Sequence, residues 1–189
     1  LGNPGKEYER TRHNAGMIAV EAFRTLESFE GFEENKKYHT LIVDGTIGKE
    51  KVLLLLPQTF MNKSGLAVAA AVKSKKAAER LVVVHDDLDV PFGAFKISFG
   101  KSSGGHKGVE SIIRALKTKD FIRVRIGVSP ATSSGKLKKP KGEKAVMQFI
   151  IGKFSKTEEE TLRKVVRKVV SALHAIVADG REKAMGKFN

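Results

Sequence analysis

The spacing of apolar residues along the first third of the chain predicts one helix and one hairpin. Residues 15–29 carry an apolar stripe at helical spacing, and it begins directly after Asn14, a residue type that caps helices. Two apolar, strand-like runs follow at 40–47 and 51–56, with a turn at Gly48-Lys49 between them. A turn this short joins antiparallel strands, so we expect a hairpin.

The rest of the chain also alternates between predicted helices and predicted strands. The expected elements are, in order, an alanine-rich helix over 64–76, short strands over 81–84 and 94–99, a helix that follows the glycine-rich loop 100–108 and ends near residue 116, and a strand over 121–128. Residues 129–144 are rich in Ser, Gly, Lys and Pro and predict a mobile surface loop. Apolar residues at i, i+3, i+4 and i+7 over 156–179, with Gly180 after them, predict a long C-terminal helix.

This order of elements indicates an α/β protein. Alternating helices and strands favour three layers, with a mixed, mostly parallel central sheet flanked by helices. A chain of 189 residues is long enough for one core and short for two, so we expect a single domain over 1–189. The chain begins at Leu1 with a loop motif that should follow a strand. We therefore expect that the complete protein has a strand before Leu1.

Composition narrows the classes of partner and of chemistry. The formal net charge is +14, and residues 136–189 hold 14 Lys and Arg against 6 Asp and Glu, so this segment carries +8 of the total. Such a basic surface favours a polyanionic partner such as a nucleic acid, although solvation alone is the alternative. The absence of cysteine excludes disulfides, thiolate metal sites and a cysteine nucleophile. The longest apolar run, 52–56, is too short for a bilayer span, and we expect a cytoplasmic protein.

Two segments carry groups suited to acid–base chemistry. His13 stands beside the start of the first helix, and histidine is the natural proton acceptor near neutral pH. His85-Asp86-Asp87-Leu88-Asp89 follows a buried strand, where ligand crevices form in α/β sheets. The carboxylates there are suited to bind Mg²⁺, to cap a turn or to orient an imidazole. The last possibility predicts a dyad of Asp86 and His13.

Two nucleotide-binding patterns match only in part, one failing on spacing and one on residue identity. Gly2 and Gly5 do not open a helix at once, as a dinucleotide fingerprint requires. The segment 100–108 has His106 and Lys107 where a phosphate-binding loop of nucleotide triphosphatases needs Lys and Ser or Thr. Its loop still precedes a helix, whose free amides attract a phosphate or an oxyanion.

Several segments together resemble bacterial peptidyl-tRNA hydrolase. They are LGNPGKEYERTRHNAG, PQTFMNKSG, HDDLDVPFG, GGHKGVESI, FIRVRIGV and VMQFIIGKF. Their order and spacing fit that family over nearly the whole chain. The resemblance implies an enzyme without cofactor or metal, which acts as a monomer on peptidyl-tRNA and cleaves the ester between peptide and terminal ribose.

The resemblance also implies roles for single residues. His13 would be the catalytic base and Asp86 its orienting carboxylate, while Asn3 and Asn62 contact the peptide end of the substrate, with the Asn62 amide as first choice for the oxyanion. Arg125 would clamp the tRNA terminus. The remaining family positions are the crevice walls Tyr8, Phe60 and Met61.

Two positions depart from the pattern of the family. Lys107 stands where the family has an asparagine, and Ser98 replaces the lysine that normally pairs with the arginine clamp. If Lys107 points into the crevice, it compensates for the missing lysine; otherwise it is a tolerated change. The rival functions are a non-catalytic RNA-binding module and a metal-dependent hydrolase that uses Asp86, Asp87 and Asp89.

Overall fold

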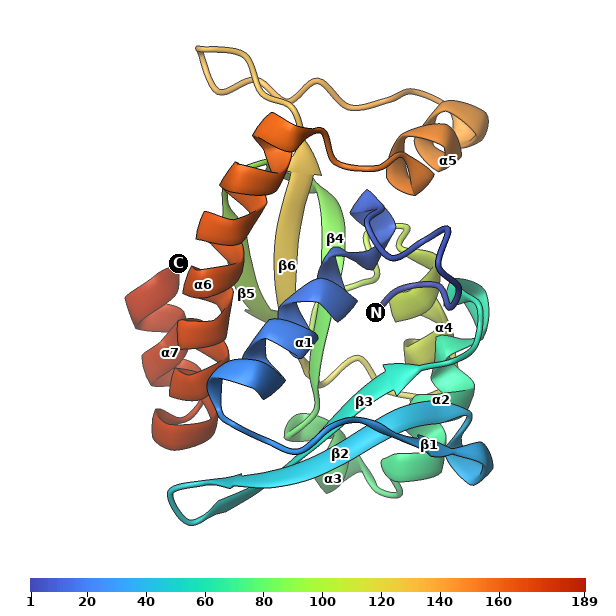
Figure 1. Ribbon diagram of the computed structural model, residues 1–189, viewed down its shortest axis with the longest axis vertical. Helices are drawn as coiled ribbons and strands as arrows, with labels where there is room; N and C mark the ends of the chain where they lie inside the picture. The colour runs from blue at the N-terminus through green and yellow to red at the C-terminus, as the bar shows by residue number, and fades with distance from the viewer.

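The computed structural model describes residues 1–189, with a three-stranded mixed sheet between layers of helices (Figure 1). The sheet has the order β4 (Val82–Pro91), β6 (Ile122–Ser129), β5 (Phe95–Phe99). β4 and β6 run parallel, whereas β5 runs antiparallel to β6. The short connection from β4 to β5 cannot form the crossover that a parallel strand needs. The α/β class and the mixed sheet flanked by helices are confirmed.

Seven α-helices and three short 3₁₀ turns surround the strands. The helices are α1 (Ala15–Leu26), α2 (Ser64–Ala71), α3 (Lys75–Glu79), α4 (Lys107–Leu116), α5 (Glu143–Ile151), α6 (Lys156–Asp179) and α7 (Arg181–Phe188), and the turns are η1 (Arg12–Asn14), η2 (Lys36–Tyr38) and η3 (Met61–Lys63). None of the helices has the length and apolar character needed to cross a membrane.

Both faces of the sheet bury apolar side chains. On one face α1 and α6 join the sheet in a cluster of 24 buried residues, which includes Val84 of β4. On the other face α2 and α4 form a smaller cluster of 7 buried residues, which includes Val83. Because successive residues of a strand point to opposite faces, neighbouring valines of β4 enter different cores. The strand is therefore fixed from both sides. It continues to Pro91, so the polar segment 85–89 lies within it and does not follow it as expected.

The predicted hairpin is present but belongs to a second sheet. β2 (Thr40–Ile47) and β3 (Glu50–Pro57) pair antiparallel, and the short strand β1 (Glu33–Asn35) adds to the free edge of β2. In Figure 1 this antiparallel sheet crosses below α1, apart from the central sheet.

Three helices differ from the sequence-based expectation. The helix expected over 64–76 is two helices, because Val72 is extended and the Ser74 side chain caps α3 by accepting from the Ala77 amide at 3.1 Å. α5 begins at Glu143, inside the expected loop 129–144. α7 follows directly after Gly180, which ends α6 but does not end helical structure.

Candidate active site

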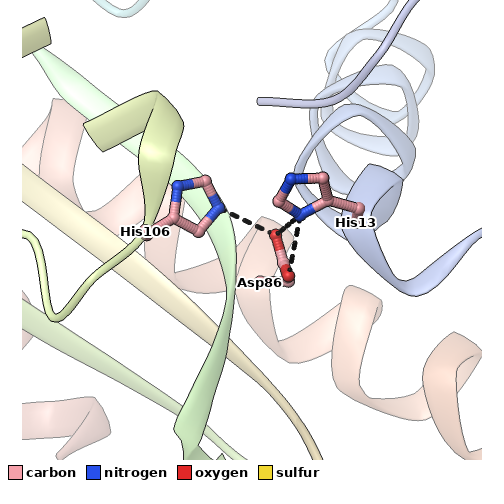
Figure 2. A group of neighbouring side chains, drawn as sticks. All are labelled: His13, Asp86 and His106. Carbon is pink, nitrogen blue, oxygen red and sulfur yellow. Dashed lines mark hydrogen bonds and ion pairs between the residues drawn. The ribbon is translucent and has the colours of Figure 1, made fainter. Parts of the chain in front are cut away.

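His13 and Asp86 meet although 73 positions separate them in the chain (Figure 2). The Nδ1 atom of His13 lies 3.0 and 3.1 Å from the two carboxylate oxygens of Asp86. Both residues are buried, with 6% and 2% of their surfaces exposed. Since an ionised carboxylate only accepts, Nδ1 carries the proton and Nε2 keeps a free lone pair. Nε2 has no hydrogen-bond partner in the protein, so it is available as a base.

A glycine in α1 makes this meeting possible. Gly16 lies against the backbone of β4, where an added Cβ would overlap the carbonyl oxygen of Val84. Because glycine lacks that atom, α1 packs directly on β4 two residues before Asp86. The turn η1, which precedes α1, then places His13 over Asp86, which lies within β4.

His106 is a second imidazole on the same carboxylate. Its Nε2 atom lies 2.9 Å from Asp86 Oδ1, and in Figure 2 Asp86 lies between the two rings. Its Nδ1 atom accepts the backbone N–H groups of Gly108 and Val109 at 3.2 and 3.3 Å and so caps α4. An acceptor at Nδ1 leaves the proton of a neutral imidazole on Nε2. The cap of α4 therefore fixes His106 as a donor to Asp86.

These contacts keep Asp86 ionised and its neighbour His85 neutral. Burial alone would raise the pKa of Asp86, but the two imidazoles that face it, His13 and His106, hold that pKa well below its usual range. Burial lowers the pKa of His85 well below its usual value. The His85 ring packs edge-on against His106 at 4.7 Å between centroids and makes no contact with His13. His85 therefore supports His106 by packing.

The residues expected at the peptide end gather next to η1. The Asn3 backbone is bound on both sides by the Asn14 side chain, at 2.8 and 2.9 Å, and Asn3 Oδ1 accepts the Met61 amide at 2.8 Å. These bonds place η3, and with it Asn62, beside the loop that leads to His13. The Asn62 side chain is exposed and makes no hydrogen bond in the protein.

The three expected crevice walls differ in exposure. Phe60 is 59% exposed, and Tyr8 is half-buried. Met61 is only 4% exposed and packs in the smaller core, so it is a core residue and offers little surface to a substrate.

Arg125 lies on β6, where its register partner on β4 is His85. Its Nε atom donates to Asp87 Oδ2 at 2.7 Å, and its direct cross-strand partner on β5 is the exposed Lys96. Ser98 is buried opposite Arg123, and its hydroxyl has no partner. The position of the missing clamp lysine therefore faces a different arginine from the one expected to clamp.

Lys107 is the first residue of α4 and lies at the surface. Its side chain is 61% exposed, and Nζ lies 4.0 Å from Glu143 Oε1 at the start of α5. The expectation of free amides at the start of this helix also needs correction, because His106 occupies those of Gly108 and Val109. The side chain of Lys107 therefore lies at the surface, and its role as a substitute for the lysine missing at Ser98 stays a prediction.

The three clustered carboxylates do not form a metal site. Asp86 receives the two imidazoles, Asp87 receives Arg125, and Asp89 pairs with Lys139. The ligand atoms of His13, Asp86 and His106 do lie within 4.8 Å of one another. However, a metal needs the lone pair of an imidazole nitrogen, and His106 Nε2 carries a proton while Nδ1 caps α4. The cluster thus fits a hydrogen-bonded triad better than a metal centre.

His106 is the member of the site that sequence reasoning missed. A helix cap is normally Ser, Thr, Asp or Asn, so a histidine directly before the apolar pattern of 107–116 attracts no attention as a cap. A neutral imidazole has one acceptor nitrogen and one donor nitrogen. A histidine directly before a helix can therefore cap the helix with the acceptor and donate to a carboxylate with the other nitrogen, and this is the signal that could have identified His106.

Comparisons with known proteins all give the same family, over the whole length of the chain. The family model described as peptidyl-tRNA hydrolase matches residues 1–189. The peptidyl-tRNA hydrolase of Caldanaerobacter subterraneus is 41% identical over 191 residues, covering 100% of this chain and 96% of the relative. That of Syntrophotalea carbinolica is 38% identical over 190 residues, covering 100% and 94%. The crystal structure of peptidyl-tRNA hydrolase from Acinetobacter baumannii superposes with a TM-score of 0.87 at 30% identity, covering 100% of this chain and 91% of that one.

The chain therefore belongs to the peptidyl-tRNA hydrolase family, ester hydrolases that release tRNA from peptidyl-tRNA.

Proposed function

We propose that His13 is the general base of the hydrolysis and that Asp86 orients it. Nε2 of His13 takes a proton from water, the resulting hydroxide attacks the ester carbonyl carbon, and the ribose hydroxyl leaves as the protonated imidazole returns the proton. One observation carries this proposal: Asp86 binds Nδ1 of His13, and Nε2 is left without a partner. Base catalysis of this kind contributes about 10² to 10⁴ in rate.

Two asparagine amides are suited to hold the substrate. The uncommitted side chain of Asn62 supports a role as N–H donor to the oxyanion that forms on the ester carbonyl. Asn3 Oδ1 is already taken by the Met61 amide, so only its N–H₂ group remains to donate to a peptide carbonyl. The exposed ring of Phe60 and the half-buried Tyr8 supply apolar surface for the peptide.

The proposed chemistry needs no metal ion. We expect hydrolysis of peptidyl-tRNA to continue at the same rate after dialysis against EDTA, provided that the assay buffer contains enough Na⁺ to keep the tRNA soluble and the ionic strength constant. The measurement is release of free tRNA with and without chelator, with re-addition of Mg²⁺ or Zn²⁺ as the control. Loss of activity in EDTA that either ion restores would contradict the proposal and favour a metal-dependent hydrolase.

For the tRNA end, the cross-strand pair of Lys96 and Arg125 replaces the expected clamp. Residues directly opposite in an antiparallel pair have Cβ atoms about 4.5 to 5.5 Å apart, so both cations lie on one face of the sheet. Arg125 is 21% exposed, and beyond Nε its guanidinium has no partner in the protein. Two adjacent cations with free donors suit a phosphate of the tRNA terminus.

This assignment makes opposite predictions for two lysines. Lys96→Gln should raise KM for peptidyl-tRNA several-fold with little change in kcat, because a phosphate contact is made equally in the ground state and the transition state. Lys107→Asn should leave both constants unchanged, because Lys107 is directed to Glu143. Steady-state kinetics of the two variants in one buffer are the measurement. A rise in KM for Lys107→Asn alone would instead restore the compensation hypothesis.

We further propose that the protein acts as a monomer in the cytoplasm, where ribosomes produce peptidyl-tRNA. His13, Asp86 and His106 all come from one chain, so a second subunit is not needed to complete the triad. The family match does not favour the alternative of a non-catalytic RNA-binding module.

A further inference from the structure

We propose that Arg12 is a positioning residue for this reaction: its guanidinium ties the turn that carries His13 to the start of α6 and so fixes His13 against Asp86. The inference rests on the role of His13 proposed above. Arg12 precedes His13 directly in η1. In a basic protein that binds tRNA, an arginine at this place would ordinarily be taken for a phosphate contact.

Two of the three guanidinium nitrogens of Arg12 bind protein groups, and two aromatic rings pack against the guanidinium. Nη2 donates to both carboxylate oxygens of Glu158, at 2.7 and 3.0 Å, and Nη1 donates to the Lys153 carbonyl at 3.2 Å. The rings of Phe149 and Phe154 lie 4.6 and 5.4 Å from the guanidinium carbon. Only 13% of the side chain is exposed. A side chain so enclosed is not available to a tRNA phosphate.

The backbone next to Arg12 binds the same segment, just before α6, that the Arg12 side chain binds. The Arg12 amide donates to the Gly152 carbonyl at 3.1 Å, and the Phe154 amide donates to the Arg10 carbonyl at 3.2 Å. Thr11 and Lys153 form an isolated antiparallel bridge between these bonds. In Figure 1 the connection from α5 to α6 accordingly passes beside the chain that leads into α1. The link between the two segments therefore includes backbone and side chain.

Glu158 is itself held rigidly. It is the third residue of α6 and completes a capping box, in which its carboxylate accepts the Ser155 amide at 2.7 Å and its amide donates to Ser155 Oγ at 3.2 Å. Burial would raise the pKa of Glu158, but the Ser155 and Arg12 donors lower it, so Glu158 stays ionised. α6 is anchored along its length in the larger core. The bonds from the Arg12 guanidinium to the Glu158 carboxylate therefore connect η1 to α6, the most extensively packed helix.

The turn η1 needs such an anchor because it has little internal support. It has three residues, and its N-cap Thr11 makes no side-chain capping bond. On the other side of His13, Asn14 binds the backbone of Asn3. His13 is thus held between two anchors, one toward the substrate loop and one, Arg12, toward α6. Loosening either should let the imidazole drift from Asp86.

The test uses Arg12→Lys and Glu158→Gln. Lysine keeps the charge but cannot form the fork with a carboxylate and a carbonyl. Glutamine at position 158 can still complete the capping box, so the start of α6 is preserved while the ionic partner of Arg12 is lost. We expect Arg12→Lys to lower kcat by about 10- to 100-fold at nearly unchanged KM, because misplacement of a catalytic group by about 1 Å costs up to that much. Glu158→Gln should lower kcat in the same way but less.

The double variant and a matched control complete the experiment. Arg12→Lys with Glu158→Gln should be no slower than Arg12→Lys alone, because both changes break one link. Glu159→Gln is the control: this neighbouring glutamate pairs with Arg10, whose side chain is 74% exposed, and it makes no contact with η1. It should behave as wild type. Thermal unfolding of each variant shows whether the fold is retained; if Arg12→Lys does not fold, the milder Glu158→Gln carries the test.

Each other outcome overturns the inference. Wild-type kcat in folded Arg12→Lys and Glu158→Gln would show that the link does not position His13. A higher KM at unchanged kcat would make Arg12 a substrate contact instead. Additive losses in the double variant would mean that the two residues act separately. With His13→Ala inactive in the same assay, these results refute only the role of Arg12; if His13→Ala is active, both proposals are wrong.

Discussion

His13→Ala is expected to lower kcat for peptidyl-tRNA hydrolysis by about 10² to 10⁴, the usual contribution of a general base. KM and the affinity for uncharged tRNA should change little, because the buried imidazole contributes no charge or surface to the tRNA contact. The measurement is single-turnover release of tRNA, which isolates the chemical step, together with Kd for uncharged tRNA. A folded variant that keeps more than about a tenth of wild-type kcat would refute the assignment.

His174→Ala is a suitable control for that substitution. His174 lies on α6, is half-exposed and pairs with Glu27 at 2.8 Å, far along the chain from the triad. Its loss removes an imidazole of the same chemistry from a surface position. It should therefore leave kcat unchanged, and a large effect of both substitutions would point to general destabilisation rather than to base catalysis.

The pairing of His13 with Asp86 was predictable because both residues stand where local patterns are unambiguous. Asp86 follows a run of valines that reads as a buried strand, and His13 precedes a clear amphipathic helix. The expected position of Asp86 after the strand is wrong, because β4 continues to Pro91 and Asp86 lies within it. The residue types alone left three roles open for the carboxylates, and the resemblance to peptidyl-tRNA hydrolase decided for the pair with His13.

The remaining site features depend on contacts that no local pattern encodes. His106 reaches Asp86 only because α4 docks on the sheet and uses the other ring nitrogen as its cap. The enclosure of Arg12 depends on α5 and on Glu158, 146 positions away. α5 itself begins within a stretch whose composition favours a loop, and it packs against η1, where the Phe149 ring contacts the Arg12 guanidinium. Tertiary packing overrides local preference at each of these positions.

The second large effect is expected at Asp86. In the native site Oδ1 of Asp86 accepts from His106 Nε2 at 2.9 Å and from His13 Nδ1 at 3.0 Å, while Oδ2 faces only His13. In Asp86→Asn the fixed donor of His106 requires the amide oxygen at the Oδ1 position. The N–H₂ group then faces His13 Nδ1 and favours the tautomer with the proton on Nε2, which is no longer a base. We expect kcat to fall by about 10² to 10⁴, as for other carboxylate-to-amide changes that reverse a catalytic histidine.

A second substitution, His106→Asn, is expected to restore part of the turnover that Asp86→Asn loses. His106→Asn keeps an acceptor for the start of α4, since asparagine is a good helix cap, but its short side chain removes the donor to residue 86. In the Asp86→Asn background the amide is then free to rotate, so that its oxygen accepts from His13 Nδ1 and Nε2 becomes a base again. Asp86→Asn with His106→Asn should therefore turn over faster than Asp86→Asn alone, although slower than wild type.

His106→Gln serves as the control for this rescue because it can still direct an N–H group toward residue 86. In the Asp86→Asn background it should give no recovery. Single-turnover rates of the two double variants, measured beside each single variant and with thermal unfolding to confirm folding, decide the matter. If His106→Asn slows Asp86→Asn further, or if both double variants recover equally, His106 does not set the orientation of residue 86. Its contact with Asp86 would then matter only for packing α4 against the sheet.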